Sequence, residues 1–214
     1  MIYLLTLLLI HATKSYTKPL GTIMTNTIFH NKEFEINGIS VPDFELKSGN
    51  LIRIYIPSVR IIKFDLTIES IKHLQKINAN LPWAKNYSQN SFSEHLFPLT
   101  VKKYLIKKMK IDEQDASRIA DELEVGLNDK FERIGFINRK ALIIKAHFEK
   151  SNSIIIDYYG VSAIGIKKLE RIVNSEIEKG KTGIAFDLLE YMEEKEPYEN
   201  IERIKITVPN TVYI

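Results

Sequence analysis

The strongest candidate for chemistry in this sequence is an aspartate that ends a short apolar run. The run Ser153–Asp157 reads Ser-Ile-Ile-Ile-Asp, with a helix-like stretch before it and another after it. This order is typical of a buried parallel strand in an α/β protein. Ligands bind in such proteins at the carboxyl ends of the strands. Asp157 therefore stands where a carboxylate could meet a ligand or a metal ion.

Other patterns that could carry chemistry are weaker. Gly180-Lys181-Thr182 spells the end of a phosphate-binding loop, but Ser175 stands where the first glycine is required, and the segment runs from helix to strand. We therefore interpret Gly180 as a helix cap. The pair Glu193 and Glu194 lies in a charged, solvated run. The histidines show no metal-ligand spacing: they are His11, His30, His73, His95 and His147.

The composition indicates a single globular protein without strong charge. Of the 214 residues, 44% are apolar and 27% are charged, which suits one α/β domain with a sizeable core. The net charge of +3 is mild, and a nucleic-acid-binding protein usually concentrates more positive charge. There are no cysteines, so disulfide frameworks and thiolate metal sites are excluded. A reducing, cytoplasmic setting is expected.

The first part of the chain is predicted to form antiparallel β-structure followed by one helix. Runs of alternating or β-branched apolar residues predict strands over 27–34, 39–46 and 51–56. The spacing of the apolar residues in 67–77 predicts an amphipathic helix. Residues 81–98 are rich in Pro, Asn and Ser and are expected to form a loop in which Trp83 packs.

A helix pair is predicted next, over 100–110 and 112–125. The first helix carries five lysines and the second six acids, so the charges are expected on two solvated faces that pair across the hairpin. A functional basic patch is the alternative interpretation. Asp112 is expected to cap the second helix. Alternating helices and strands follow over 138–150, 153–157, 165–179 and 182–186, and then a closing hairpin of 201–208 with 211–214.

Residues 1–23 are predicted to be an extension that precedes the folded domain. Residues 1–10 are nearly all apolar, but they are too few to span a bilayer and no positive charge precedes Lys14. The preferred interpretation is a gene start placed too early, with Met24 as the true start. A weak secretory leader is the alternative. Residues 24–214 are expected to form one domain with a helical insert at about 89–136.

The order of these elements and several short strings resemble the ATP-binding domain of ABC transporters over about residues 28–187. Residues 39–54 look like the family's opening hairpin and the strand before its phosphate loop. Tyr87-Ser88-Gln89-Asn90 is similar to its glutamine loop, and residues 139–146 resemble the helix after its signature motif. Ile154-Ile155-Ile156-Asp157 looks like its Walker B strand, and Gly135 falls near a signature glycine. The resemblance implies a three-layer α/β fold of the P-loop NTPase type, with an N-terminal antiparallel β region and a helical insert.

Most residues that the family's chemistry needs are replaced in this sequence. The strand 51–56 is followed by Pro57-Ser58-Val59-Arg60-Ile61-Ile62-Lys63, which has no glycine to form a backbone cradle for phosphates. Tyr158 stands where the family has its catalytic glutamate. Phe186, Asp187 and Leu188 stand where its switch histidine is expected. Ile134 and Phe136 replace the signature serine and second glycine. The remaining vestiges of a nucleotide site are Gln89, Gly135 and Asp157.

The resemblance and these replacements together imply a catalytically inactive ATPase-like protein that acts by binding. No catalytic residue, metal ligand or cofactor is then expected. The implied partner is a membrane permease or an ABC ATPase subunit, and dimerisation is compatible with this role. The chain is expected to be cytoplasmic or peripheral at the inner membrane, without spanning it. The candidate partner contacts are the apolar residues Leu96, Phe97, Pro98 and Leu99.

Two other functions stay open at this point. The chain could be an NTP-binding ABC ATPase with an atypical phosphate site built from Lys63 or Arg60, in which case ATP and magnesium would be its cofactors. It could instead be a free-standing cytosolic adaptor with no link to a transporter. No nucleic acid is expected as a partner in any of these cases.

Overall fold

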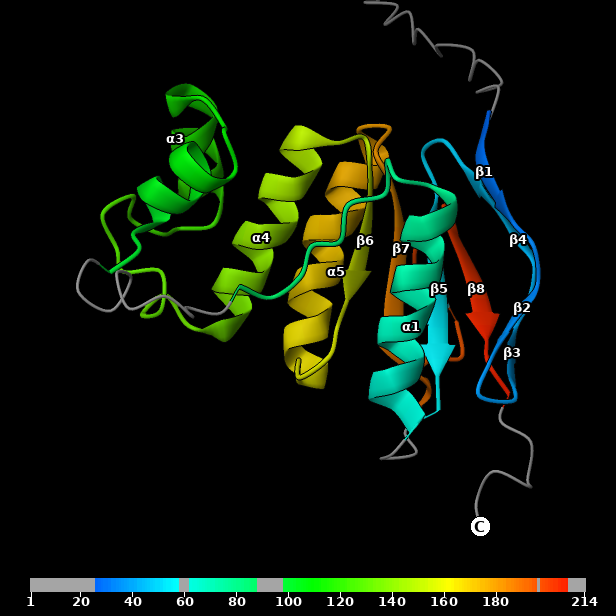
Figure 1. Cartoon of the computed structure of the whole chain (residues 1–214). Coiled ribbons are helices and arrows are strands. Elements are labelled where there is room, and N and C mark those ends of the chain that lie inside the picture. Colours follow the sequence, from blue (N-terminus) through cyan, green and yellow to red (C-terminus); the bar gives the residue numbers. More distant parts are fainter. Residues whose placement is uncertain (1–25, 58–61, 88–97, 196, 208–214) are drawn as a thin grey trace, which may run out of the picture.

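The computed structural model describes residues 26–57, 62–87, 98–195 and 197–207, and it shows an α/β arrangement in layers around one parallel sheet (Figure 1). The sheet has four strands in the order β6-β7-β5-β8, and all three strand pairings are parallel. Its strands are β5 (Leu51–Ile56), β6 (Ser153–Asp157), β7 (Thr182–Leu188) and β8 (Ile201–Lys205). Helix α1 (Ile62–Ile77) lies on one face, and helices α4 (Phe136–Lys150) and α5 (Ala163–Glu178) lie on the other. The predicted fold class is confirmed.

Alternating residues of the strands point to opposite faces of the sheet and contribute to two separate hydrophobic cores. Ile52, Ile54 and Ile56 pack with α1 and with the N-terminal β-structure. Ile154 and Ile156 pack with α4 and α5. All six residues of β5 are buried, because both of its faces are covered and it has a neighbouring strand on each side. The predicted bounds of β5 and β6 are confirmed.

The N-terminal antiparallel region is present, but it forms four short strands where two long ones were predicted. These are β1 (Thr27–Asn31), β2 (Phe34–Ile36), β3 (Ile39–Val41) and β4 (Phe44–Lys47). Strand β1 pairs with β4, and β2 pairs with β3. Asn37 and Gly38 both have positive φ, at 51° and 78°, which makes the tight turn between β2 and β3. Pro42 separates β3 from β4 because proline has no N–H to donate.

Three other predicted elements differ from the structure. Helix α1 begins at Ile62, before the predicted start at Thr67. The first helix of the predicted pair is instead a short π-helix, η1 (Lys103–Lys108). Its hydrogen bonds reach five residues back, as in the bond from Met109 N to Tyr104 O at 3.0 Å. Strand β8 lies parallel to β5, while the second strand of the predicted closing hairpin falls outside the described residues.

The helical insert stands to one side of the sheet and shares a core with α4 (Figure 1). Asp112 is the N-cap of helix α3 (Glu113–Glu122), because its side chain accepts a hydrogen bond from Asp115 N at 2.9 Å. The predicted N-cap is confirmed. Buried residues of the insert, such as Tyr104 and Ile119, join the same apolar cluster as α4 and α5. The insert is therefore packed onto the α4 side of the molecule.

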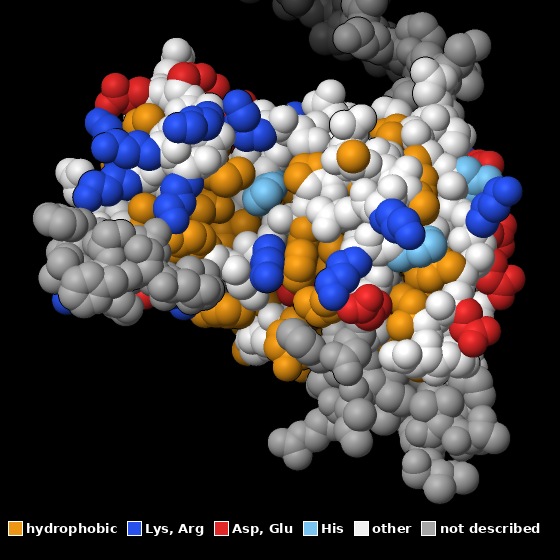
Figure 2. All heavy atoms as spheres, in the orientation of Figure 1, with side chains coloured by type: hydrophobic (Ala, Val, Ile, Leu, Met, Phe, Trp, Pro, Cys, Tyr) orange, Lys and Arg blue, Asp and Glu red, His pale blue; other side chains and the backbone are white. Residues whose placement is uncertain are grey.

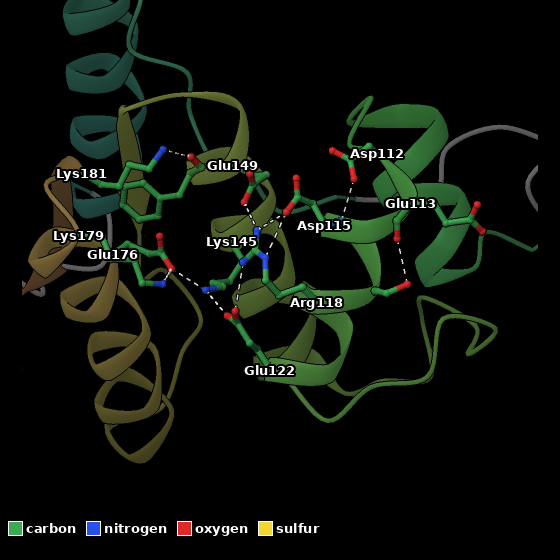
Figure 3. A network of polar contacts seen from close by, with 12 residues as sticks. Asp112, Glu113, Asp115, Arg118, Glu122, Lys145, Glu149, Glu176, Lys179 and Lys181 are labelled. Atoms are coloured by element: carbon green, nitrogen blue, oxygen red, sulfur yellow. Dashed lines mark hydrogen bonds and ion pairs between the residues drawn. The ribbon is translucent and has the colours of Figure 1, made fainter.

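A chain of charged side chains runs across α3, α4 and α5 (Figure 3). Arg118 of α3 pairs with Asp115 at 2.7 Å and with Glu149 of α4 at 2.6 Å. Lys145 of α4, which is 6% exposed, pairs with Glu122 of α3 and with Glu176 of α5. The acids of α3 that take part are thus turned toward α4, and they connect the insert to the helices that cover the sheet.

The stability of the protein should depend on pH through Glu176. Burial opposes ionisation of this carboxyl, but hydrogen bonds and charges from Lys145 and Lys179 outweigh it and lower its pKa. A carboxylate with a lowered folded pKa stabilises the fold above its unfolded pKa and loses that contribution as the pH falls. We expect Glu176→Gln to cost about 1–2 kcal/mol at pH 7 and to become nearly neutral as the pH falls toward about 3.

Urea unfolding of both proteins between pH 3 and pH 7 measures this difference. Glu178→Gln is the matched control, because Glu178 lies in the same helix and is exposed. A difference between Glu176→Gln and the natural protein that stays constant across the pH range would contradict the prediction.

Candidate functional site

The candidate site lies at the carboxyl end of β6, where Asp157 was predicted to stand. The carboxylate is buried, with 4% of the residue exposed. Both of its oxygens accept hydrogen bonds from the chain itself. Oδ2 accepts from Trp83 Nε1 at 2.8 Å and from Lys140 Nζ at 3.1 Å, and Oδ1 accepts from Tyr159 N at 3.3 Å. The predicted position of Asp157 at the end of the strand is correct. Its contacts with Trp83 and Lys140 were not predicted, because Trp83 was expected only to pack within its loop.

Trp83 reaches Asp157 because its segment lies along the free edge of β6. Ala84 N donates to Ile155 O at 2.8 Å, and Ile155 N donates to Pro82 O at 2.9 Å. These two bonds add a short stretch of parallel pairing beside β6. The indole is thereby held at the end of the strand. The expected loop around Trp83 is in part an extension of the sheet.

Lys140 reaches the same oxygen from the first turns of α4. Its side chain is 0% exposed, so its ammonium group has no contact with solvent. Burial lowers the pKa of Lys140, and the negative charge of Asp157 acts in the opposite direction. Burial also lowers the pKa of His147, on the same helix, to about 4, with a smaller contribution from the charge of Lys140. His147 is therefore neutral at pH 7.

A small pocket opens beside this group. Its volume is about 200 Å³. Lys85 lies over the ring of Trp83 at 5.1 Å from the ring centre. The lining is formed by α1, the 83–86 segment and the residues at the end of β6: Thr67, Ile68, Trp83, Lys85, Asn86, Asp157 and Tyr159. Asp157 lines this pocket, and its oxygens accept three hydrogen bonds from the chain itself.

A second charged group lies on the α5 face of the sheet. Arg53 of β5 is 5% exposed and pairs with Asp187 of β7 at 2.5 Å and with Glu170 of α5. The guanidinium also lies over the rings of Tyr55 and Tyr158, at 5.1 and 5.8 Å. Burial raises the pKa of Asp187, and Arg53 acts against that shift. Asp187 is therefore engaged inside the molecule.

Tyr158 follows Asp157 and is also buried, with 3% exposed. Burial raises the pKa of its hydroxyl well above the ordinary value, so the group stays protonated. A buried, protonated phenol does not act as a base toward water at neutral pH. The residue that the resemblance aligns with a catalytic glutamate therefore has no access to solvent and no basic character.

The other predicted site residues are distributed as follows. Gly135 precedes the first residue of α4, is exposed, and has a φ of 70°. Pro98 is half-buried, while Leu99 is only 6% exposed and packs in the core with α4, so its side chain is not available at the surface. Gln89, Leu96, Phe97 and the extension 1–23 lie outside the described residues.

No known protein family and no curated protein matches this sequence. Solved structures do match its fold. An ATP-binding cassette of an ABC transporter in its ADP conformation is 14% identical, with a TM-score of 0.54, over 83% of this chain and 87% of that one. A nucleotide-free ATP-binding cassette from an ABC transporter is 12% identical, with a TM-score of 0.52, over 82% of this chain and 87% of that one.

A third match is an archaeal ribosome recycling factor in complex with a ribosomal stalk protein. It is 13% identical with a TM-score of 0.54, over 91% of this chain and 42% of that one. These likenesses establish the fold: the chain has the three-layer architecture of an ABC ATPase domain. Within the part of the chain that the structure describes, no helix is long and apolar enough to cross a membrane. The same residues contain no cluster of three or more metal-binding side chains.

The buried pair of Lys140 and Asp157 should show strong energetic coupling. Lys140→Met leaves a buried carboxylate without its cation, and we expect a loss of about 3–5 kcal/mol in the free energy of unfolding. Lys140→Met combined with Asp157→Asn removes both charges and should cost less than the sum of the two single changes. A double-mutant cycle by urea unfolding measures the coupling.

The matched control is the exposed pair of Lys72 and Glu69, which lie 2.7 Å apart with side chains 64% and 48% exposed. The cycle of Lys72→Met and Glu69→Gln should give a coupling of about 0.5 kcal/mol or less. Equal coupling in the two cycles would show that Lys140 and Asp157 are not a buried pair.

Proposed function

We propose that this chain is a catalytically inactive ABC ATPase-like protein that acts as a binding, accessory subunit of a transporter or a related complex. The observation that carries the proposal is the internal pairing of Asp157, whose oxygens accept from Lys140, Trp83 and the backbone N–H of Tyr159. A carboxylate that supports magnesium in a nucleotide site must be open to the ion or its waters. Here the chain's own ammonium group supplies the positive charge.

The neighbouring positions support the same proposal. Tyr158 stands where the resemblance places a catalytic glutamate, and Asp187 is one of the three residues, 186–188, that stand where it places a switch histidine. Tyr158 is buried and protonated, and Asp187 is held by Arg53. In this proposal, Tyr158 and Asp187 contribute to the packing between the sheet and α5, and neither is placed to contact a nucleotide.

The connection between β5 and α1 gives independent support from the sequence. It consists of residues 57–61, which read Pro-Ser-Val-Arg-Ile. A phosphate loop uses glycines so that consecutive backbone N–H groups can surround the phosphates. This connection has no glycine and includes β-branched residues, which do not readily adopt the backbone conformations required.

The proposed partner is a membrane permease or a competent ABC ATPase subunit, which would place the chain in the cytoplasm and peripherally at the inner membrane. The solved structures with this fold include ATP-binding cassettes of ABC transporters. The candidate contact segment is Leu96, Phe97 and Pro98, at the entry to the helical insert. Binding through the insert would leave the paired interior of the sheet undisturbed.

Nucleotide titration tests the loss of the phosphate site. Calorimetric titration of the purified chain with ATP and magnesium should show no saturable binding tighter than about 1 mM, whereas a competent ATP-binding cassette measured alongside should bind. Tight, magnesium-dependent binding would refute the proposal. It would favour an atypical site built from Lys63 or Arg60, for which Asp157→Asn should abolish turnover.

Affinity capture from the source cell tests the accessory role. The natural chain should retain a permease or ATPase subunit, and Leu96→Asp with Phe97→Asp should reduce the yield of that partner at least about tenfold. The control is Ile28→Asp with Ile77→Asp, because these two residues are apolar and 39% and 48% exposed on other elements. Equal recovery with both double variants would contradict the predicted contact segment, and recovery of cytosolic partners alone would favour the adaptor.

A further inference from the structure

The insert carries a group of exposed lysines that the proposed function does not explain. All five lysines of residues 102–110 are exposed: Lys102, Lys103, Lys107, Lys108 and Lys110. Lys150, at the end of α4, joins them, because its Nζ donates to Lys110 O at 3.2 Å. We call these six residues the lysine group. Figure 2 shows one face of the molecule, and on this face basic side chains (blue) gather over the insert.

The lysine group is not neutralised by the acids of the neighbouring helix. Lys102 pairs with Glu113, and Lys108 contacts the ring and hydroxyl of Tyr87. Within the described part of the chain, no ion pair engages the other four members: Lys103, Lys107, Lys110 and Lys150. Asp115 and Glu122 of α3 instead turn toward Arg118 and Lys145, as Figure 3 shows. The sequence predicted that the two sets of opposite charges would pair across the hairpin. Within residues 98–195 only the pair of Lys102 and Glu113 is present, so four members of the lysine group keep their positive charge without an acidic partner from α3: Lys103, Lys107, Lys110 and Lys150.

The side chains around the lysine group favour a lipid surface over nucleic acid. The group is made of lysines alone, and lysine is a compact point charge that suits phosphate without selecting a shape. Single-stranded nucleic acid is usually held by exposed aromatic rings, but here Tyr104 is 4% exposed, and the half-buried ring of Tyr87 packs against Tyr104 and Phe131. Ile106 and Met109 lie between the lysines, partly buried against the core, and only their exposed parts could meet the headgroup region.

We propose that the lysine group binds the headgroups of an anionic phospholipid membrane. Clusters of four to eight basic residues near a membrane surface are attracted to acidic lipids by charge alone. The π-helix η1 buries Tyr104 and Leu105 in the core of the insert. Its Lys103 and Lys107 are exposed at the surface. The insert would then approach the bilayer with its lysines, while Glu122 of α3 stays paired to Lys145 of α4.

Vesicle sedimentation tests this proposal with the full chain. The protein should bind vesicles of about 30% phosphatidylglycerol in phosphatidylcholine at low salt, bind pure phosphatidylcholine vesicles at least tenfold more weakly, and be released by about 0.5 M salt. The variant Lys103→Glu, Lys107→Glu, Lys110→Glu should lose binding by at least about tenfold. The control variant Lys32→Glu, Lys76→Glu, Lys205→Glu has the same charge change on exposed lysines of other elements and should bind nearly as well as the natural chain.

Three results would overturn the proposal. They are equal binding to both kinds of vesicle, equal loss in both triple variants, and tighter binding to an RNA or DNA duplex than to the anionic vesicles at the same salt concentration. Circular dichroism of each variant verifies that it is folded. Because bare vesicles contain no permease or ATPase, a negative result would leave the accessory role standing, and nucleotide binding would not affect the lipid result.

Discussion

The need to pair a buried carboxylate organises the centre of this molecule. Asp157 lies at the end of the edge strand β6, where the ammonium of Lys140 and the indole of Trp83 both reach one of its oxygens. An unpaired charge in this position would be strongly destabilising. The start of α4 and the 82–84 segment are therefore both held to the end of β6. With the bond from Tyr159 N, both oxygens of Asp157 are engaged in hydrogen bonds within the chain.

Pairing of charges also explains why acidic and basic side chains are unevenly distributed over the helical insert. Lys145 is almost fully buried and needs acids close to it, and Glu122 and Glu176 supply them from α3 and α5. The acids that take part in this arrangement cannot also screen the lysines of η1. The pairing of Lys145 in the interior thus leaves Lys103, Lys107 and Lys110 of the insert without an acidic partner from α3.

Local patterns in the sequence predicted what depends on periodicity and caps, and missed what depends on long-range contacts. The runs 51–56 and 153–157, the cap at Asp112 and the turn at Gly180 were read correctly because each is determined within a few residues. The Asn37-Gly38 turn was a local signal that could have been recognised. Lys140 gave no such signal, since it sits beside an apolar helical run, and its partner is seventeen positions away. Arg53 and Asp187 are similarly separated by 134 residues.

The two edges of the parallel sheet are protected in different ways. Beside β6, residues 82–84 occupy the backbone groups that would otherwise be open. At the other edge, β8 carries Glu202, Arg203 and Lys205, and charged side chains discourage a further strand from adding to it. Two copies of this chain are consequently poorly suited to growing into a common β-sheet. A strand of another protein would meet the same obstacles at either edge of this parallel sheet.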